Sequence, residues 1–560
     1  MLKENIQESL LSLKDKKRFF RINGEKKVWF YDSYTQGMYS VNKDYLQKIE
    51  ECISPEIEKF SELKVEDFAQ FVNFFAAVHK NNIDSIPQNP IETKCNIMIN
   101  TSNRCNLRCT YCYCNKKDPS VNSLKTMKDT INYAMTRYKL DASEFVVSYS
   151  MTSESSVDLP LLKQIVDEYI NYENYQFVED DIIDDFFEEF YEKVKKKLFS
   201  KIKLNLEFPQ KEISSVVDFL NKLLSFRDLY DILEVTDRMF NDDARWQIQK
   251  RENCAKWKLY RINRWCLEVI FDKYLKKRHV PYVTFWFMSN GTCASDEFIE
   301  FIKACDINPF WISIDGPKIV HDKNRKFNNE NGSYDEIINN LIKFRKNGIN
   351  LKASVVLTAD FPKPLEIIRH IQYLGFIEVS MTPIRPGYEC SFDENSILEL
   401  CKGYDEVFDA LENMCIKNDF SLFRFLKEDL TLSAFNVFLS RTKLVKRCSF
   451  DNQIVVNSKG EIYPCLYFTD NKEFNLGNIK DGIDFSKVNH NITVDKRGEC
   501  NNCWARYLCG GTCFYGSYVS NQDYVKIDSV ECILKKYLAE KCLKLIVFMH
   551  EHNINIHNVY

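Results

Sequence analysis

The sequence predicts an α/β protein in which a parallel sheet is the central element, with a small α+β unit before it and a cysteine-rich unit after it. Strand-like and helix-like segments alternate from about residue 92 to 390, which is typical of parallel sheets. A hairpin pattern precedes this region, and closely spaced cysteines follow it. At 560 residues and 66.2 kDa, the chain is long enough for two or three domains.

Residues 1–88 form the first predicted unit. Two short strands rich in aromatic and β-branched residues, 18–22 and 27–31, flank Asn23-Gly24, which is a strong hairpin signal. A third strand is expected at 37–41, and helical patterns follow at 43–52 and 65–80. A small sheet with a free edge can receive an extended peptide as a further strand. A plain capping subdomain is the alternative interpretation.

Six strands are expected in the central region, at 96–100, 144–150, 283–288, 310–314, 351–357 and 377–384. Helical patterns such as 334–346 and 365–374 separate them, as in successive βα units of a parallel sheet that is either open or curled into a partial barrel. The reacting centre of such folds lies at the carboxyl ends of the strands. The first spaced cysteines follow the first strand at this end.

A long insertion interrupts the alternation between the second and third strands. About 130 residues separate these strands, and roughly 100 of them exceed what one helix and its loops need. The inserted piece, about 172–280, is mostly helical in pattern. We expect it to be a substrate lid or docking surface, with a structural or oligomer contact as the alternative. A helical bridge at 391–445, a cysteine-rich domain at 446–535 and a C-terminal helix at 536–560 complete the predicted domains.

Composition and charge point to no nucleic-acid or membrane partner. The net charge is -4 and the isoelectric point about 6.2, whereas nucleic-acid-binding domains are normally basic. The first 20 residues carry charges throughout, unlike a secretory signal, and no uncharged apolar run reaches the roughly 18 residues that would indicate a membrane span. We therefore expect a cytoplasmic protein whose thiols are reduced, since disulfide scaffolds are usually small secreted domains.

The cysteines near the front have the spacing Cys105-x3-Cys109-x2-Cys112. An iron–sulfur cluster normally takes four thiolates, so three would leave one iron open to another ligand. Zinc is the competitor, but this spacing within one loop is unusual for a tetrahedral zinc site. Cys114 is expected to be a buried thiol that does not bind metal, and substitution as a ligand is the alternative.

The segment TSNRCNLRCTYCYCN, with Tyr111 before the third cysteine, resembles the signature of the radical S-adenosylmethionine (SAM) family. The resemblance covers roughly 92–390 and implies a partial (β/α)6 barrel. It further implies that SAM chelates the open iron and that one electron from the cluster cleaves SAM to a 5′-deoxyadenosyl radical, which removes hydrogen from a substrate carbon. An electron donor of the flavodoxin or ferredoxin type is an expected partner.

Other motifs of the family follow the later strands. Asn290 lies in Ser-Asn-Gly-Thr after the third strand, and Ser313-Ile314-Asp315-Gly316-Pro317 follows the fourth, with Arg325 downstream. The resemblance implies that Tyr111, Asn290, Ser313, Asp315 and Arg325 lie at the SAM site, where Ser313 and Arg325 would hydrogen-bond the cofactor.

One motif departs from the family. After the second strand the family usually has Gly-Gly-Glu, whereas this chain has Thr152-Ser153-Glu154. Glu154 can still accept a hydrogen bond from the ammonium group of SAM. Thr152 and Ser153 cannot adopt positive φ as cheaply as glycine, so either the loop path differs or their hydroxyls join the contact.

Seven cysteines near the back, in register with Gly460, Gly510 and Gly511, resemble the extension called SPASM: Cys448, Cys465, Cys500, Cys503, Cys509, Cys513 and Cys532. The resemblance implies two auxiliary clusters, one held by Cys500, Cys503, Cys509 and Cys532 and the other by Cys448, Cys465 and Cys513. Cys415, a non-cysteine group or an open iron would complete the second. Taken alone, the Cys500-x2-Cys503 spacing also fits zinc.

These motifs predict a radical SAM/SPASM enzyme with three 4Fe–4S clusters that modifies a ribosomally made peptide. The first domain would hold a leader peptide, and an oxidative step would form a C–S or C–C bond, with a thioether favoured if an auxiliary iron is open. Oxidation of a small molecule or protein side chain without a leader is the alternative. Formylglycine formation is disfavoured, because Leu466 replaces the acid that follows the corresponding cysteine in sulfatase-maturing enzymes. No catalytic side chain is assigned.

Overall fold

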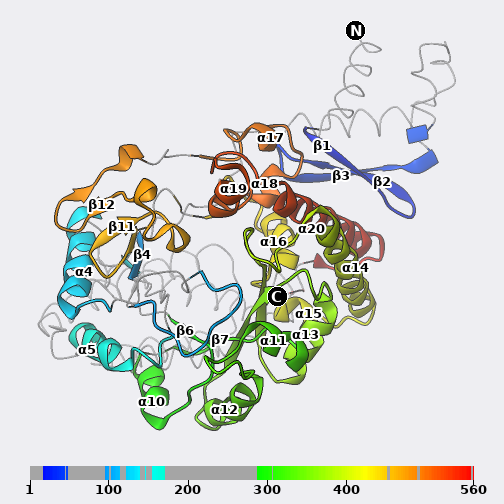
Figure 1. The fold of residues 1–560 in the computed structure, drawn as a ribbon. Coiled ribbons are helices and arrows are strands. Elements are labelled where there is room, and N and C mark those ends of the chain that lie inside the picture. Colours follow the sequence, from blue (N-terminus) through cyan, green and yellow to red (C-terminus); the bar gives the residue numbers. More distant parts are fainter. Residues whose placement is uncertain are drawn as a thin grey trace, which may run out of the picture. The chain divides into compact units, whose positions relative to one another are not determined.

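The structure is a computed structural model that describes residues 17–44, 46–47, 95–99, 102–113, 121–138, 145–146, 154–170, 287–305, 307–448, 450, 454–487, 492–556 and 559. The chain divides into one unit of Met1–Lys139, Val146–Tyr169 and Val283–Tyr560 and another of Leu140–Phe145 and Ile170–Tyr282. Nearly all described residues belong to the first unit (Figure 1). The predicted insertion at 172–280, the predicted helix at 65–80, and Cys114, Thr152 and Ser153 lie outside the described residues.

A three-stranded antiparallel sheet opens the described part, in the order β1-β2-β3. Its strands are β1 (Phe19–Asn23), β2 (Lys27–Asp32) and β3 (Gly37–Asn42). The expected hairpin forms at Asn23-Gly24, where the Gly24 N–H donates to the Lys27 carbonyl at 2.9 Å. A small apolar cluster holds one face of the sheet together; it consists of Phe19, Val28, Phe30 and Leu46.

A four-stranded parallel sheet contains the last four strands of the predicted βα series, in the order β6-β7-β8-β9. They are β6 (Met288–Ser289), β7 (Phe310–Ser313), β8 (Leu351–Leu357) and β9 (Glu378–Pro383). The connecting helices are α10 (Asp296–Ala304), α11 (Lys318–Asn324), α12 (Tyr334–Lys346) and α13 (Pro364–Tyr373). This alternation confirms the prediction of an α/β architecture.

The first two predicted strands, β4 (Cys95–Ile99) and β5 (Phe145–Val146), belong to a different sheet. In the order β13-β12-β11-β10-β4-β5, strand β10 (Ile454–Val456) of the cysteine-rich region pairs in parallel with β4. Antiparallel strands β11 (Glu461–Tyr463), β12 (Gly477–Asn478) and β13 (Gly482–Ile483) extend it. Helices α4 (Leu124–Tyr138) and α5 (Leu159–Ile170) follow β4 and β5. Within the described ranges, the six strands therefore lie in two sheets rather than one.

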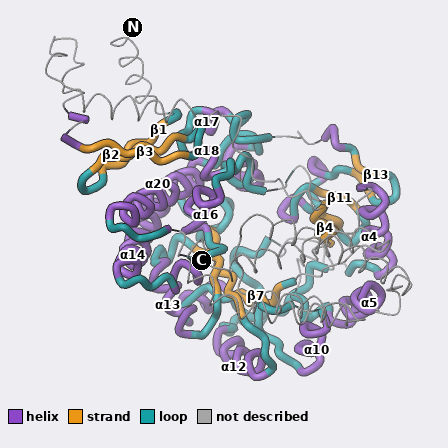
Figure 2. The backbone as a smooth tube through the Cα atoms, turned by 180° about the vertical axis from the view of Figure 1, so that it is seen from behind, coloured by secondary structure: helices purple, strands orange, loops and turns teal. Residues whose placement is uncertain are grey.

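Helices dominate the remainder of the chain. They are α14 (Glu394–Ile416), α15 (Ser421–Phe425), α16 (Ser433–Ser440), α17 (Gly498–Asn501), α18 (Arg506–Cys509), α19 (Phe514–Asn521) and α20 (Ser529–Glu551). Short 3₁₀ turns lie at η4 (Leu430–Leu432), η5 (Leu466–Phe468), η6 (Lys472–Phe474) and η7 (Phe485–Lys487). Long helices α14 and α20 lie side by side (Figures 1 and 2).

Helix α20 begins earlier than expected, so the predicted boundary between 535 and 536 falls inside it. The carboxylate of Asp528 fixes its start by accepting from the N–H groups of Val530 and Glu531 at 3.0 and 3.1 Å. Such an N-cap satisfies donors that the first helical turn leaves without partners. As a result, Cys532 lies in the first turn of a long helix rather than in a loop.

The N-terminal sheet packs against the cysteine-rich region through α20 and α18. The Phe20 ring stacks on Trp504 with centroids 3.9 Å apart. At the far end of α20, the Glu551 carboxylate accepts from Trp29 Nε1 at 3.0 Å and from the Glu25 N–H at 2.6 Å. Figure 2 shows β1 beside α17 and α18. The sheet is thus attached to the same helix that carries Cys532.

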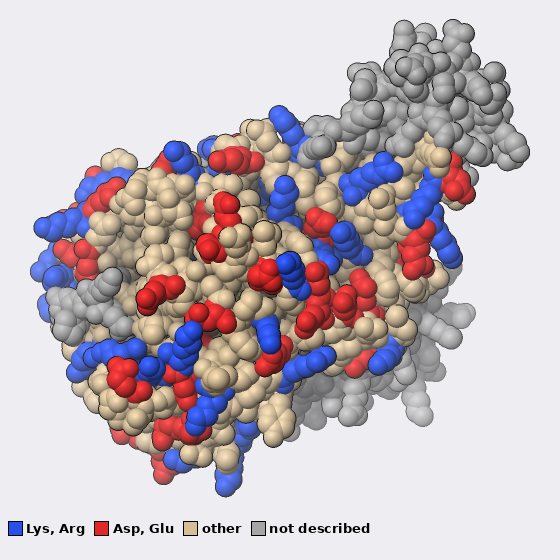
Figure 3. Space-filling model, turned by 45° about the vertical axis from the view of Figure 1, so that its right-hand side comes forward, with Lys and Arg blue, Asp and Glu red and all other residues tan. Residues whose placement is uncertain are grey.

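Surface charge gives no single-sign patch on the face shown in Figure 3, where Lys and Arg side chains alternate with Asp and Glu. This agrees with the nearly balanced composition of 76 basic and 80 acidic residues. Among the described helices, none combines the length and apolar character needed to cross a membrane.

Candidate iron–sulfur and SAM site

The loop after β4 holds the front cysteines and is fixed against the segment that follows α11. The Arg108 N–H donates to the Lys326 carbonyl at 2.7 Å, and the Thr110 N–H donates to the Asn324 carbonyl at 3.0 Å. Leu107 and Phe327 form an isolated β-bridge between the same two segments. These backbone contacts shape the loop, and the Leu107 N–H also donates to Cys105 Sγ at 3.4 Å.

Cys105, Cys109 and Cys112 lie close together, since a negative charge on Cys112 would raise the pKa of both Cys105 and Cys109. Burial raises the pKa of Cys105 to about 11 and that of Cys109 to about 12, although the nearby Arg325 guanidinium opposes the rise at Cys109. Thiols in such surroundings keep their protons unless a metal replaces them. The three side chains are thus a compact soft-donor set whose deprotonation requires a strongly bound partner.

Glu154 lies directly after the second strand's loop and is buried. Its Oε1 accepts from Ser289 Oγ at 2.6 Å and from Ser156 Oγ at 2.9 Å, and its Oε2 accepts from the Asn290 N–H at 2.7 Å. Burial raises the pKa of Glu154, and these hydrogen bonds oppose the rise. The carboxylate therefore ties the loop before α5 to the end of β6, beside the place where the cofactor ammonium is expected.

The Asn290 amide connects this carboxylate to the front cysteines. Its Nδ2 donates to Asn106 Oδ1 at 2.8 Å and lies 3.6 Å from Cys105 Sγ, while Asn106 Nδ2 donates to Thr292 Oγ1 at 2.8 Å. Gly291 has φ +78°, and a Cβ there would stand 2.7 Å from Ile312 Cγ2. Both the backbone conformation and the lack of space therefore disfavour any side chain at this position. The Asn-Gly-Thr run is therefore a turn that aims an amide at the cysteine loop.

Tyr111, Asp315 and Arg325 form a second polar group on the other side of the loop. The Tyr111 hydroxyl donates to Asp315 Oδ2, and Arg325 Nε donates to the same oxygen at 2.9 Å. The guanidinium lies 5.4 Å from the Tyr111 ring centroid. Asp315 Oδ1 accepts from the Val356 N–H at 3.0 Å. The structure thus brings together three of the residues predicted for the SAM site and pairs them with one another.

Ser313 ends β7 and is half-buried, paired in register with Ser354 of β8. Together with Asn290, Asp315 and Glu154 it follows the carboxyl end of a strand, which is the edge expected to carry the chemistry. Thr152 and Ser153 cannot be placed against these four, because they lie outside the described residues.

His321 is a neutral ring that hydrogen-bonds to the loop containing Asp315. Its Nδ1 accepts from the Asp315 N–H at 3.2 Å, so the proton resides on Nε2, which faces Ser333 Oγ at 2.9 Å. Burial lowers the pKa of His321 from 6.5 to about 4. A proton on Nδ1 would place the N–H of His321 against the N–H of Asp315. Acidification would therefore break the hydrogen bond between them.

We therefore predict that acid weakens the fold through His321. Below pH 6.5 the unfolded chain gains a proton that the folded chain takes up only near pH 4, so stability present above pH 6.5 is lost as the pH falls. The loss across this window amounts to about 3 kcal/mol. Denaturant unfolding of the apoprotein should show a flatter pH dependence for His321→Gln than for wild type. Equal slopes would mean that His321 does not titrate in this window.

Four back cysteines gather around the short helices α17 and α18 and the start of α20. The ionisable neighbours of Cys532 are Cys509, Cys503 and Cys500, and burial raises the pKa of Cys532 to about 12. Arg497 opposes the burial effect at Cys500, and Lys536 does so at Cys503 and Cys532. These are the four residues predicted to hold one auxiliary cluster, and we call them the four-cysteine site.

The other three, Cys448, Cys465 and Cys513, form a second group, which we call the three-cysteine site. Both Cys448 and Cys465 have Cys513 as a charged neighbour, and Cys448 is also close enough to affect Cys465. Cys415 is buried in the last turn of α14 and its charged neighbour is Glu412, so the structure does not bring it to this group. For the fourth ligand of a cluster at the three-cysteine site, the remaining alternatives are a non-cysteine group and an open position.

No disulfide joins the described cysteines. No three His, Cys, Asp or Glu side chains among the described residues are placed to share one metal ion. An iron–sulfur cluster needs a different arrangement, because it presents a separate iron to each thiolate. Cys305, Cys401, Cys415 and Cys542 are buried outside the three sets, as expected for thiols that only fill the core.

Several residues of the site were not predicted. Ser289 and Thr292 belong to the Ser-Asn-Gly-Thr motif, but no role was predicted for their side chains, and Asn106 lies between the first two cysteines of the front motif. Arg385 and Tyr467, by contrast, lie beside the three-cysteine site. Arg385 follows the carboxyl end of β9, so a rule that inspects charged residues at strand ends would have found it.

Comparison with known proteins relates the chain to maturation enzymes. No family profile matches it. It is 23% identical over 265 residues to the cysteine-type anaerobic sulfatase-maturating enzyme of Clostridium novyi (strain NT), covering 43% of this chain and 67% of that protein. It is 23% identical over 256 residues to the serine-type anaerobic sulfatase-maturating enzyme of Bacteroides thetaiotaomicron, covering 40% of this chain and 59% of that protein. The chain thus spans about three fifths to two thirds of these curated relatives.

Two solved structures are also similar to the chain. Native anSMEcpe with bound AdoMet has 14% identity and a TM-score of 0.49, covering 83% of this chain and 100% of the other. Streptococcus suis SuiB bound to the precursor peptide SuiA has 11% identity and a TM-score of 0.39, covering 92% of this chain and 98% of the other. The sequence relatives agree with the family resemblance drawn from the cysteine motifs.

Proposed function

We propose a function from the premise that this chain is an enzyme related to the anaerobic sulfatase-maturating enzymes: a radical SAM maturase that oxidatively modifies a residue of a peptide. The observation that carries the proposal is the convergence of Cys105, Cys109 and Cys112 with two sets of buried polar residues at the carboxyl ends of strands. Three clustered thiols leave one iron of a four-iron cluster open, which is where SAM would bind.

The residues around the front loop fit the two ends of SAM. Cys105, Cys109 and Cys112 would hold the cluster, and Glu154, beside Asn290, would accept from the ammonium group. Asp315 and Arg325, joined at 2.9 Å, and the neighbouring Ser313 supply hydrogen-bonding groups for the rest of the cofactor. When bound, cluster and cofactor supply a 5′-deoxyadenosyl radical that removes a hydrogen atom from the substrate. The chain's own part is to orient the cofactor and exclude water.

The back of the chain would hold two auxiliary clusters. Both groups consist of buried or half-buried thiols except Cys448, whose residue is exposed. Each has a cation nearby, Arg497 and Lys536 at the four-cysteine site and Arg385 at the three-cysteine site. Cations lower the cost of several thiolates in one place. We propose that these sites take up the electron released when the substrate is oxidised.

The proposed substrate is a ribosomally made peptide with a leader segment. Among the described residues the N-terminal sheet has three strands in the order β1-β2-β3, so β1 and β3 are the edges that would pair with an extended chain. Its contacts with Trp504 and Glu551 attach it to the helix that carries Cys532. A thioether is the favoured product, since a substrate thiolate can occupy an open position at the three-cysteine site.

Maturation of a sulfatase side chain is the second candidate. It is favoured by the two curated relatives, which are sulfatase-maturating enzymes. Leu466 opposes it, because it begins η5 directly after Cys465 and offers no acid or base. Mass spectrometry of a sulfatase-derived peptide after incubation would separate the candidates, since formylglycine formation changes the mass of one Cys or Ser only.

Metal content tests the proposal first. Anaerobically reconstituted protein is expected to hold about twelve irons per chain, three clusters of four, and to form 5′-deoxyadenosine from SAM when given dithionite. Iron analysis and chromatography measure both. Stoichiometric zinc, or about four irons, would reject the auxiliary clusters, and reconstituted protein that never cleaves SAM would reject the function as a whole.

Deletion of residues 1–88 tests the leader. We expect the shortened enzyme to lose turnover of a full-length precursor peptide while still cleaving SAM, because the front loop does not depend on β1–β3 for its backbone hydrogen bonds. Product mass and 5′-deoxyadenosine are measured together. Undiminished turnover of the precursor would assign the N-terminal sheet a purely structural role, and iron content serves as the control for folding.

A further inference from the structure

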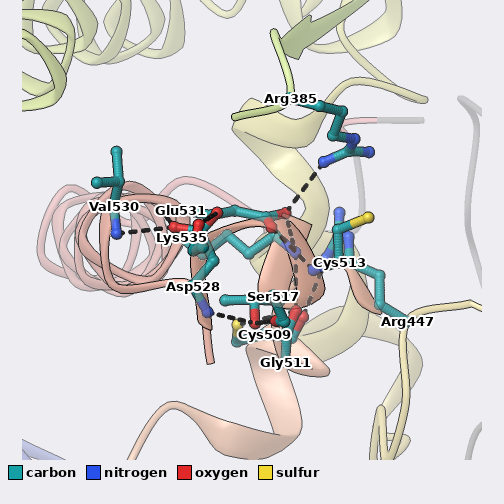
Figure 4. A network of polar contacts seen from close by, with 12 residues as sticks. Arg385, Arg447, Cys509, Gly511, Cys513, Ser517, Asp528, Val530, Glu531 and Lys535 are labelled. Atoms are coloured by element: carbon teal, nitrogen blue, oxygen red, sulfur yellow. Dashed lines mark hydrogen bonds and ion pairs between the residues drawn. The ribbon is translucent and has the colours of Figure 1, made fainter. Parts of the chain in front are cut away.

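A network of buried charges joins the parallel sheet to the three-cysteine site (Figure 4). Arg385 comes from the loop after β9, while Glu531 and Lys535 lie in the first two turns of α20. Glu531 Oε2 accepts from the Cys513 N–H at 2.8 Å, and Lys535 Nζ lies 2.7 Å from Glu531 Oε1. The network therefore reaches one of the cysteines through its backbone.

The ion pair with Glu531 does not account for the position of the Arg385 guanidinium. Its Nη1 lies 3.5 Å from Glu531 Oε1, the longest polar contact of that carboxylate, which Lys535 and the Cys513 N–H already satisfy. The Arg385 Nε is buried and has no hydrogen-bond partner among the described residues. The side chain as a whole is half-buried, and Tyr467 is a further hydrogen-bond partner of it. A buried N–H without a partner normally faces a further acceptor or anion.

The groups nearest to Arg385 that become anionic when a metal binds belong to the three-cysteine site. Cys513 and Cys465 are among its charged neighbours, together with Tyr467. The Tyr467 ring packs against Tyr113 at a tilt, with centroids 4.6 Å apart, and Tyr113 directly follows Cys112 of the front loop. Arg385 thus lies where the parallel sheet, the front loop and the three-cysteine site meet.

Charge counting shows what this place favours. Arg385 and Lys535 carry two positive charges and Glu531 carries one negative charge. Asp528 is a second acid near Glu531, but the charges of this network that act on Cys448 are the two cations. At short distances in a poorly solvated site, one unbalanced charge is a large effect. The network is therefore poised to stabilise one additional negative charge at the neighbouring thiolates.

We propose that Arg385 is a positioning residue that makes the three-cysteine site the primary electron acceptor, by stabilising the negative charge which that site gains on reduction. The inference rests on the proposed function. When the substrate radical forms its new bond, it releases one electron and one proton; the electron passes to the three-cysteine site, which becomes more negative by one charge, and the proton leaves to solvent.

Redox titration of the reconstituted full-length protein, followed by electron paramagnetic resonance, tests this. The signal of the three-cysteine site is the one that Cys465→Ala removes. Arg385→Gln is expected to shift its midpoint potential to more negative values, whereas Arg385→Lys, which keeps the charge, restores most of it. Glu531→Gln, which removes the opposing charge but keeps an acceptor for the Cys513 N–H, is expected to shift it the other way.

Lys536→Gln is the matched control, since it removes a cation from the same helix beside Cys503 and Cys532. It is expected to leave the three-cysteine signal unchanged. An unshifted midpoint in Arg385→Gln, an equal shift in Arg385→Lys, or a Glu531→Gln shift to more negative values would each overturn the inference. If Arg385→Gln loses iron, the Glu531→Gln result decides alone. Loss of SAM cleavage in wild type would instead reject the proposed function.

Discussion

Replacement of Cys109 by alanine is expected to abolish 5′-deoxyadenosine formation, whereas Cys503→Ala is expected to retain uncoupled cleavage of SAM. Cys109 is the central member of the three-thiol set and is buried. Two thiols hold a cluster poorly, and without it SAM receives no electron. Cys503 belongs to a separate site near the start of α20. Under the proposed function, that site would act only after the substrate radical has formed.

The measurement is 5′-deoxyadenosine per chain under dithionite, with iron content recorded for each variant. Cys401→Ala is the control for loss of a buried thiol, since Cys401 packs in α14 beside Asp405, outside all three sets. Equal loss in Cys109→Ala and Cys503→Ala would mean that the back sites are needed for folding rather than for electron transfer. Full activity of Cys109→Ala would reject the front assignment.

The fold was predictable where its signals are local. Strand β8 was expected at 351–357 and spans those residues, and the hairpin formed where Asn23-Gly24 places a turn. The pairing of β10 with β4 was not predictable, because Ile454 and Ile97 are far apart in the chain and both strands are short apolar runs. Nothing in either strand specifies its partner, so one sheet was expected where two occur.

The site shows the same division. Cysteine spacing and glycine turns mark which residues gather, and the structure places Cys500, Cys503, Cys509 and Cys532 together as the motif implied. The spacing of the cysteines does not predict the hydrogen-bond partners of the neighbouring residues. Glu154 was expected to bind the cofactor, yet five protein donors already contact its carboxylate: the N–H of Asn290, the N–H and hydroxyl of Ser156, and the hydroxyls of Ser155 and Ser289. Arg385 lies in no motif, and its role depends on charges from two distant elements.

Arg497→Met is expected to open the segment that contains the four-cysteine site. Arg497 is only 1% exposed, and its guanidinium has no carboxylate partner in the contacts that fix it. It donates instead to the carbonyls of Thr512 and Val525, both at 2.8 Å, to that of Lys526 at 2.8 Å, and to Ser517 Oγ at 2.9 Å. One side chain therefore satisfies the loops on both sides of α19.

Methionine fills similar space but leaves these acceptors buried without donors, which costs about 1–3 kcal/mol each. Even partial rearrangement leaves a loss of at least about 3 kcal/mol, or roughly a hundredfold in an opening equilibrium.

Hydrogen exchange of the α19 amides measures this opening directly, because it reports local rather than global unfolding. We expect protection to fall by about a hundredfold or more in Arg497→Met, with a smaller fall in Arg497→Lys, which keeps the charge but has fewer donors. Arg424→Met on the exposed face of α15 is the control and should change protection by less than about threefold. Undisturbed α19 protection in Arg497→Met would show that the loops find other donors. The iron of the four-cysteine site should follow the same order, since Gly511, with φ +86° and a would-be Cβ 3.0 Å from Arg497 Nη1, holds the turn between Cys509 and Cys513 against this guanidinium.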